Sequence, residues 1–379
     1  MYMPLTRPSS LLIATLMSAA ACAPSTSSTG DSQGATNPGA EGDDAGAVGP
    51  GDAAATTRLS TLGCTATPLA PGMHAMTLKS GGLDRTYLLW VPSGLPYNPT
   101  KPAPVVLELH GGGGRASSFD NETLWSTKGN QSGFLVIAPD GLVGRQSGGK
   151  DKEYWNSGPT CGVATTQNVD DVGFIRDLLQ TVATVTCVDP KRIFAAGHSE
   201  GAGMSHRLAC ELSDLIAAIA PASNAATLYP EDPATHPGQI PAYTCNVKSP
   251  VSVFEMHGKL DCTNPYDGGY VAGGGCNQYN PNVPSSFVWW GSNDGCTGGS
   301  GDPVATTISS TEGDVSCTSQ RGCPAGTDVT LCTFEKAGHE WFGSGKDACT
   351  AYDPNVVPIA TWKATDYAWA FFAAHPKAR

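Results

Sequence analysis

The chain has 379 residues, of which 15% are charged, with a formal net charge of −12 and a pI near 5.0. This charge would repel a polyanion, so we set nucleic acid aside as a partner. The 46 glycines and 29 prolines follow no Gly-X-Y period, which excludes a collagen-like fibre and indicates many tight turns between regular elements.

Residues 1–22 are typical of an export signal. Arg7 precedes an apolar run at 11–21 that is too short to span a bilayer but suits the hydrophobic region of a signal peptide. Two cleavages fit: an ordinary one near the small residues 19–21, or a lipoprotein-type one that places a lipid on Cys22. Ala19, where leucine would be expected, weakens the second, and Cys22 is otherwise just a small apolar residue. We expect a secreted or cell-surface protein.

Residues 23–63 are predicted to form a disordered acidic tether. The part at 23–57 carries five acids, no lysine or arginine, and Val48 as its one bulky apolar side chain, so it cannot bury a core. A tether makes most sense if its front end is held at a surface. This favours a lipid anchor at Cys22 over a free solvated tail. Residues 64–379 are predicted to form one folded domain.

Thirteen cysteines are expected in an oxidising compartment, and removing Cys22 leaves twelve, which permits six disulfides. Cys187 and Cys210 are predicted to pair, because the strand after one and the helix running back to the other are each about 20 Å long. Zinc is a competing interpretation for Cys317 and Cys323. These two lack paired C-x-x-C spacing, so we expect no metal and no other cofactor.

From Cys64 onwards, short apolar runs alternate with helical patterns, which is typical of parallel strands joined by crossover helices. Strands are predicted at 85–91, 105–110, 134–138, 192–198, 215–220, 251–257 and 329–335. Helices are predicted at 172–185 with Asp170 or Asp171 as the cap, at 200–212, around 287–293 and at 364–374. The proline-rich stretch 221–250 is predicted to be a long loop at the carboxyl edge of the sheet, where ligands bind. The expected fold is α/β, with a mostly parallel sheet, helices on both faces and disulfide-rich loops.

Residues 197–201 read Gly-His-Ser-Glu-Gly and match the pattern G-x-S-x-G. In a glycine-rich chain the pentapeptide alone is weak evidence, but a strand pattern at 192–196 precedes it and a helical pattern follows. This order is typical of the nucleophile elbow of an α/β-hydrolase, in which small neighbours keep a tight turn clear and the hydroxyl stands above the sheet. Ser199 is the predicted nucleophile.

A serine nucleophile needs a base to take its proton and a carboxylate to orient that base. Asp261 follows the strand that ends near His257, and His339 follows the strand that ends near Glu335. The order Ser, Asp, His is the one expected of this architecture. Singly, Asp261 could be a turn residue and His339 a surface histidine; with the elbow they form a predicted catalytic triad.

Acyl transfer also needs donors for the negative oxygen of the tetrahedral intermediate. Four glycines follow His110 after a strand, and the backbone N–H of Gly112 is the first predicted donor, with that of Glu200 as the second. A phosphate loop is disfavoured because its Lys-Ser/Thr pair is missing. Trp155 and Trp341 are candidates to line an acyl or sugar pocket, although core or rim packing explains each equally well.

Several segments together resemble a known family. They are Leu-His-Gly-Gly at 109–112, Trp-Asn at 155–156, Asp-Asp-Val-Gly-Phe at 170–174, Val-Asp-Pro-Lys-Arg at 188–192, the elbow, His-Gly-x-x-Asp at 257–261 and Gly-His-x-Trp at 338–341. Over about residues 70–375 the chain resembles secreted feruloyl esterases and the related polyhydroxybutyrate depolymerases. The resemblance implies the α/β-hydrolase fold and catalytic roles for Ser199, Asp261 and His339. Departures at 201–203, at Cys262 after the acid and in the cysteine-rich segment 296–332 leave the substrate open.

The favoured hypothesis is a monomeric serine esterase, a carboxylic-ester hydrolase, that acts on feruloyl or acetyl groups of plant cell-wall polysaccharide. The nearest alternative is a polyester depolymerase with the same machinery. A depolymerase that works on solid polymer often carries a separate binding domain, whereas a hydrolase of soluble oligomers needs none. A third hypothesis, from another class, is a catalytically silent binding protein at the cell surface, against which the complete triad argues.

Overall fold

The computed structural model describes residues 59, 64, 67–145, 151–158, 160, 162–226, 245, 247–270, 279–298, 304–308 and 315–377. All of them belong to one contact unit, Gly49–Arg379. The predicted export signal with Cys22 lies outside the described residues, as does nearly all of the predicted tether. Much of the proline-rich stretch 221–250 also lies outside them.

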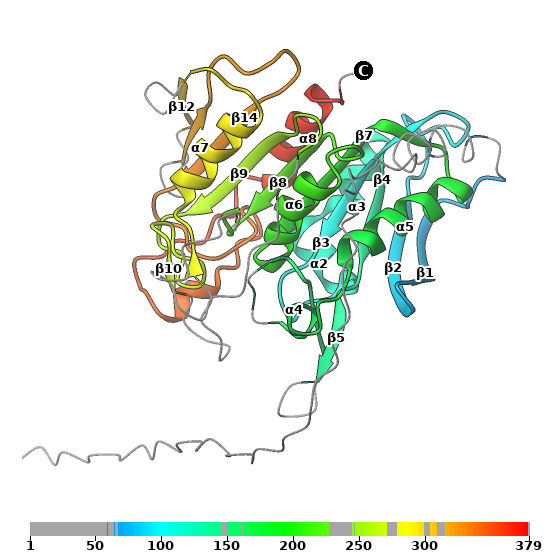
Figure 1. Cartoon of the computed structure of the whole chain (residues 1–379), viewed down its shortest axis with the longest axis horizontal. Coiled ribbons are helices and arrows are strands. Elements are labelled where there is room, and N and C mark those ends of the chain that lie inside the picture. The colour runs from blue at the N-terminus through cyan, green and yellow to red at the C-terminus, as the bar shows by residue number, and fades with distance from the viewer. Residues whose placement is uncertain are drawn as a thin grey trace, which may run out of the picture. The chain divides into compact units, whose positions relative to one another are not determined.

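A ten-stranded mixed sheet runs through the centre of the domain (Figure 1). In spatial order its strands are β1 (Gly72–Ser80), β2 (Leu83–Val91), β4 (Leu135–Pro139), β3 (Ala103–Leu109), β7 (Val188–His198), β8 (Ala218–Ala222), β9 (Ser252–Gly258), β14 (Val329–Phe334), β13 (Val315–Ser319) and β12 (Val304–Ile308). The strands from β4 to β14 pair in parallel, and antiparallel pairs flank them on both sides. The predicted mostly parallel sheet is confirmed.

Helices cover both faces of this sheet. They are α2 (Ala116–Thr123), α3 (Trp125–Ser132), α4 (Val163–Thr166), α5 (Asp171–Val185), α6 (Glu200–Glu211), α7 (Val283–Asn293) and α8 (Ala364–Ala374). Figure 1 shows α5, α6 and α7 in front of the sheet and α8 behind it. Among the described residues, no helix combines the length and the apolar character needed to cross a membrane.

The two core layers follow from the alternation of side chains along the strands. In β3, Val105 packs in the same cluster as residues of α5 and α6, whereas Val106 packs in the other cluster with residues of α3 and α8. In β7, Ile193 packs in the cluster of Val105 and Phe194 packs in the cluster of Val106. Successive side chains of a strand point to opposite faces, so strands buried on both faces read as continuous apolar runs.

The helix α5 shows why the local prediction worked. Apolar residues recur at helical spacing and are buried, and the Asp170 side chain caps the first turn by accepting the N–H of Gly173 at 2.8 Å. The bounds predicted for α8 are also those observed. By contrast, α2, α3 and the edge strand β1 were not predicted. The two helices are short, and the residue between them, Leu124, has a φ of 59°, a break that no Gly or Pro announces.

Two small ladders stand apart from the main sheet: β5 (Leu142–Arg145) with β6 (Asp151–Tyr154), and β10 (Gly269–Tyr270) with β11 (Tyr279–Asn280). A 3-10 helix, η3 (Ala348–Ala351), follows β14. The predicted strand at 215–220 is observed as β8, which starts three positions later and ends two positions later, because Leu215 and Ile216 are buried in the connection before it.

Five disulfides occur among the described residues: Cys64–Cys187, Cys210–Cys245, Cys262–Cys349, Cys296–Cys323 and Cys317–Cys332. The predicted Cys187–Cys210 pair is therefore wrong. Element lengths restrict where a cysteine lies but do not choose among several cysteines nearby. The two cysteines weighed as zinc ligands are each oxidised to a separate partner, and Cys317 bonds to the residue directly opposite it on β14. Cys161 and Cys276 lie outside the described residues.

Candidate active site

Ser199 occupies a sharp turn between β7 and α6, with φ 57° and ψ −120°. Positive φ is costly for a residue with a side chain, and such strain clusters at functional sites. A Cβ on Gly197 would lie 2.2 Å from Gly201 O, and a Cβ on Gly201 would lie 2.1 Å from Leu109 O. The predicted strand, turn and helix are present, and close backbone packing explains both flanking glycines.

Asp261 and His339 are in direct contact. The Nδ1 atom of His339 lies 2.9 and 3.1 Å from the two carboxylate oxygens of Asp261. The N–H groups of Thr263 and Asn264 donate to the same carboxylate at 2.8 and 2.7 Å. Burial by itself would raise the pKa of Asp261, but the rings of His339 and His257 hold that pKa well below its usual range. The carboxylate is thus ionised at neutral pH and able to orient His339.

Ser199 and His339 line the same cavity, of about 340 Å³. Its other lining residues are 110–114, Arg115, Ser118, Phe119, Glu122 and His198. Asp261 lies behind His339 and is buried. The structure therefore brings the predicted nucleophile, base and glycine loop together around one cavity, with the predicted acid held against the base.

Two backbone N–H groups of the glycine loop after β3 are hydrogen-bonded within the protein. The N–H of Gly113 donates to Glu153 O at 2.7 Å and that of Gly114 donates to Gly111 O at 2.9 Å. The N–H of Gly112 has no acceptor among the described residues. The N–H of Glu200 lies in the first turn of α6, where a helix provides no acceptor of its own. Both predicted oxyanion donors are thus available.

Trp155 does not line the cavity. Its ring is fully buried and its Nε1 donates to His110 O at 2.9 Å. Its backbone N–H donates to Glu200 Oε2 at 3.1 Å. Because a fully buried ring cannot stack on a ligand, the expectation that Trp155 contacts substrate gives way to the packing alternative: it supports the strand and loop that carry the glycines.

The side chain of Glu200 lies beneath Gly112, since a Cβ on Gly112 would meet Glu200 Oε2 at 3.2 Å. Burial raises the pKa of Glu200 to about 8, against which the hydrogen bond from Trp155 acts only in part. The group therefore carries a proton at neutral pH. Its contribution to the oxyanion region is a backbone donor together with a neutral, packed side chain.

Trp341 is buried at the wall of a second cavity, of about 220 Å³. Its Nε1 donates to Thr365 Oγ1 at 3.1 Å. Glu122 lines both this cavity and the one that contains Ser199, so the two adjoin at that residue. Trp341 does not itself line the serine cavity, but its ring packs edge-on against Phe119, which does, with centroids 6.1 Å apart.

His198 was not predicted as a site residue. Its ring centroid lies 4.6 Å from that of His339, and it lines the cavity. Burial and the neighbouring His339 lower the pKa of His198 well below its usual value, so this ring is neutral. The position of His198 in the sequence could have predicted this role. It is the last residue of β7, so it lies at the edge of the sheet where Asp261 and His339 also lie.

A buried titratable cluster supports the glycine loop from behind. His110, Asp140 and Glu153 have donor atoms within 4.8 Å of one another, close enough to hold a metal ion. However, the Nδ1 of His110 lies 2.9 Å from Gly111 O and its Nε2 accepts the N–H of Gly141 at 3.0 Å, so both ring nitrogens are used. Burial, together with Asp140, raises the pKa of Glu153 to about 8. The His110 ring therefore has no nitrogen left for a metal ion, whereas Oε2 of Glu153 is buried without a hydrogen-bond partner among the described residues.

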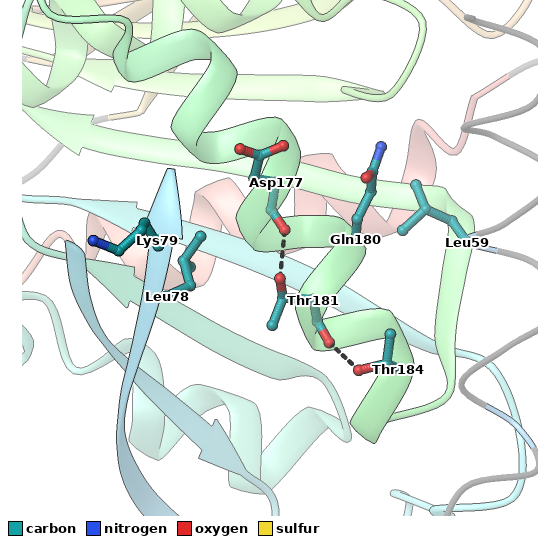
Figure 2. Close-up of a pocket in the computed structure, with 7 residues that line it drawn as sticks. All are labelled: Leu59, Leu78, Lys79, Asp177, Gln180, Thr181 and Thr184. Atoms are coloured by element: carbon teal, nitrogen blue, oxygen red, sulfur yellow. Dashed lines mark hydrogen bonds between the residues drawn. The ribbon is translucent and has the colours of Figure 1, made fainter. Parts of the chain in front are cut away.

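Another cavity, of about 560 Å³, lies between β1 and α5 and includes Leu59 (Figure 2). It contains none of the predicted site residues. The hydroxyls of Thr181 and Thr184 donate to backbone oxygens of their own helix at 2.8 and 2.7 Å. The residues that line this cavity therefore do not form a nucleophile, base and acid arrangement like that at the serine cavity.

No protein-family model matches the chain. A feruloyl esterase B from Piromyces equi is 31% identical over 266 residues, covering 69% of this chain and 44% of the relative. A poly(3-hydroxyalkanoate) depolymerase C from Paucimonas lemoignei is 29% identical over 204 residues, covering 54% of this chain and 42% of the relative. An acetyl xylan esterase structure from Aspergillus awamori has a TM-score of 0.50 and 15% identity, covering 80% of this chain and 99% of that one. The chain spans less than half the length of these two curated relatives.

The sheet order, the turn at Ser199 and the placement of Asp261 and His339 after β9 and β14 define an α/β-hydrolase. The similarity to the solved structure supports this fold. Within it, the chain is similar in sequence to proteins named feruloyl esterase and to one named poly(3-hydroxyalkanoate) depolymerase.

Proposed function

We propose that the protein is a serine carboxylic-ester hydrolase that removes feruloyl or acetyl groups from plant cell-wall polysaccharide. The observation that carries the proposal is the serine cavity: Ser199 at a strained turn, His339 on the same cavity wall, and Asp261 hydrogen-bonded to His339 at 2.9 Å. A nucleophile, a base and an orienting acid in this arrangement support acyl transfer.

In the first step of the proposed reaction, Ser199 Oγ attacks the ester carbonyl while Nε2 of His339 takes the hydroxyl proton. Asp261 accepts the Nδ1–H of His339, which sets the tautomer and stabilises the positive ring. The N–H groups of Gly112 and Glu200 receive the developing oxyanion. His339 then passes its proton to the departing alcohol, which leaves an acyl-enzyme on Ser199.

In the second step, water attacks the acyl-enzyme. His339 takes a proton from the water, the oxyanion again forms beside Gly112 and Glu200, and the carboxylic acid departs as the proton returns to Ser199. These two steps need only side chains and backbone groups of the cavity, so the proposed mechanism uses no cofactor.

The substrate class rests on the relatives named feruloyl esterase and on the acetyl xylan esterase fold. The polar glycine wall and the open serine cavity suit a small acyl group attached to a hydroxylated carrier, and the cavity beside Trp341 is placed for a remote part of such a carrier. Polyester depolymerase is the second candidate, because the Paucimonas lemoignei relative carries that name.

A substrate panel tests the proposal. The kcat/KM for methyl ferulate and acetylated xylan fragments should exceed that for hydroxybutyrate oligomers, and an advantage for the oligomers would transfer the proposal to the depolymerase. A fluorophosphonate probe should label the active wild-type protein but not the Ser199→Ala variant. A chain that neither reacts with the probe nor hydrolyses any ester would instead support the silent binding protein.

We further propose that the protein is exported and anchored by a lipid on Cys22. Support comes from the five disulfides among the described residues, because such bonds persist in oxidising compartments. Wild-type protein should partition with membranes, whereas Cys22→Ser should be released or left unprocessed. A mature wild-type form that starts after Ala21 or Ala23 and stays free of membranes would indicate ordinary secretion.

A further inference from the structure

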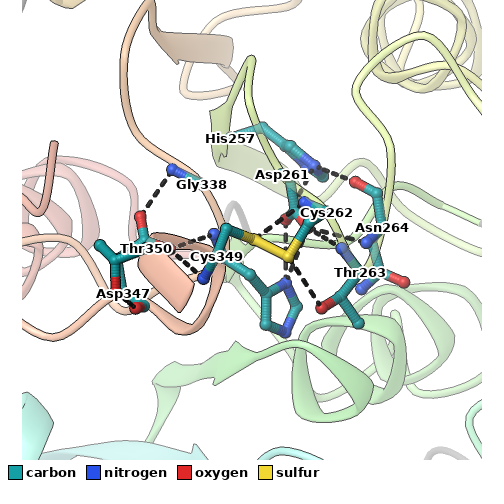
Figure 3. Close-up of a disulfide and its surroundings, with 10 residues drawn as sticks. His257, Asp261, Cys262, Thr263, Asn264, Gly338, Asp347, Cys349 and Thr350 are labelled. Carbon is teal, nitrogen blue, oxygen red and sulfur yellow. Dashed lines mark hydrogen bonds and ion pairs between the residues drawn. A yellow bond between two sulfur atoms is a disulfide. The ribbon is translucent and has the colours of Figure 1, made fainter. Parts of the chain in front are cut away.

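The loops that carry Asp261 and His339 are joined by a disulfide next to the acid (Figure 3). Cys262 directly follows Asp261, and its sulfur is bonded to Cys349 in η3, across 87 residues of sequence. The backbone N–H of Cys262 also donates to Cys349 Sγ at 2.9 Å. Cys349 is buried and Cys262 is exposed, so the bond fixes the acid loop on one side and meets solvent on the other.

Asp347 fixes the base loop to the same junction. Its carboxylate accepts the N–H groups of Gly338, His339 and Cys349 at 2.6, 3.0 and 2.8 Å. No side chain fits at Gly338, because a Cβ there would lie 2.7 Å from both Asp347 Oδ1 and Cys349 Cβ. The backbone that carries the His339 ring is therefore held against the cysteine that anchors the acid loop.

These contacts close a ring of interactions around the acid and the base. One path from Asp261 to His339 is the direct hydrogen bond. The other runs through Cys262, the disulfide, Cys349 and the Asp347 carboxylate. Among the described disulfides this is the one that adjoins a residue of the proposed triad. Reacting groups displaced by about 1 Å can lose about 100-fold in rate, so this second path bears on turnover.

We propose that the Cys262–Cys349 disulfide and Asp347 are positioning elements of the triad, and that reduction of the disulfide by a dithiol lowers turnover. This inference rests on the proposed esterase function. The dithiol's thiolate attacks the exposed Cys262 sulfur and Cys349 leaves as a thiolate. The second thiol of the reagent then closes its own disulfide and releases Cys262. The two protons of the dithiol end on the cysteines, and its two electrons reduce the bond.

The first experiment compares two double variants. C262S/C349S removes the bond beside the acid, whereas C296S/C323S removes the bond between the loop after α7 and the loop after β13. With p-nitrophenyl acetate as the probe, C262S/C349S should lose about 10- to 100-fold in kcat with KM within about twofold, because ground-state binding does not need an aligned base. The control should keep kcat within about twofold. Activities are normalised to the folded fraction measured by circular dichroism.

The second experiment separates positioning from general stability. In an Asp261→Ala background the bond has no acid left to position, so C262S/C349S should cost less than about threefold in kcat. An equal loss in both backgrounds would overturn the proposal, since the bond would then act on the folded protein as a whole.

A third measurement needs no cysteine variant. Treating wild-type protein with dithiothreitol should lower kcat, and reoxidation should restore it.

The Asp347 variants test the other positioning element. Asp347→Asn keeps one acceptor oxygen and should lose less kcat than Asp347→Ala, which keeps none. Wild-type protein that hydrolyses no ester would overturn the proposed function. Active wild-type protein that keeps its kcat after mass spectrometry shows Cys262 and Cys349 reduced would overturn only the positioning role.

Discussion

The two halves of the candidate site are held in place by different forces. On the nucleophile half, Gly197 and Gly201 bring backbone segments so close that no Cβ fits, and Ser199 is strained between them. On the acid–base half, side-chain acceptors and a disulfide fix two long loops around Asp261 and His339. We therefore expect added side-chain atoms to disrupt the nucleophile half. Loss of a hydrogen-bond acceptor or of the disulfide should disrupt the acid–base half.

The largest expected effect tests the nucleophile itself. Ser199→Ala should lower kcat by about 10⁴-fold or more while the protein stays folded, because a half-buried hydroxyl that lines the cavity contributes little to the core. Steady-state kinetics with a small aryl ester, together with a thermal unfolding curve, measure both. A variant that keeps more than about one hundredth of the wild-type kcat would remove Ser199 from the mechanism.

Replacing the acid, Asp261, should have the second-largest effect on kcat. Asp261→Ala leaves His339 Nδ1 without its acceptor and should lower kcat by about 10²- to 10⁴-fold. Asp267→Ala, in the same loop but outside the proposed triad, is the matched control and should change kcat little.

The glycine packing predicts a loss of stability. A Cβ at Gly201 meets the fixed backbone of Leu109, so Gly201→Ala should reduce the free energy of unfolding by more than about 3 kcal/mol or prevent folding. Gly203→Ala in the same helix is the control and should cost less, because its Cβ meets side-chain atoms of Asn224 and Ser157 at 3.0 and 3.3 Å rather than backbone, and alanine favours the helix. Equal urea midpoints for the two variants would contradict this account of the elbow.

The smallest expected effect concerns Glu200 and pH. Its folded pKa of about 8 lies above the ordinary value of 4.5, so its contribution to stability is complete below pH 4.5 and is lost as pH rises towards 8. Gln does not titrate. The stability of Glu200→Gln relative to wild type should therefore increase from pH 5 to 8, by up to about 1.4 kcal/mol per pH unit. Urea unfolding at several pH values measures it, and a constant difference would show that the buried acid is not neutral.

The sequence predicted best those site residues whose position is set by the strand or helix next to them in the chain. The elbow at 197–201 needs a strand before it and a helix after it, and both were readable from apolar spacing. Asp261 and His339 each follow a strand, and parallel strands bring their carboxyl ends to one edge, so their contact could be expected before the structure. The catalytic roles themselves remain predictions that the variants above will test.

Tertiary packing alone decided which residues far apart in sequence meet. The motif around Trp155 did not reveal that its ring is buried under the glycine loop, nor could cysteine spacing choose Cys64 for Cys187. The approach of Asp347 to the backbone of His339 depends on how the loop after β14 folds back, which no periodic pattern records. Apolar periodicity reports the face of an element that is buried, whereas the partner across that face is set by close packing of the whole domain.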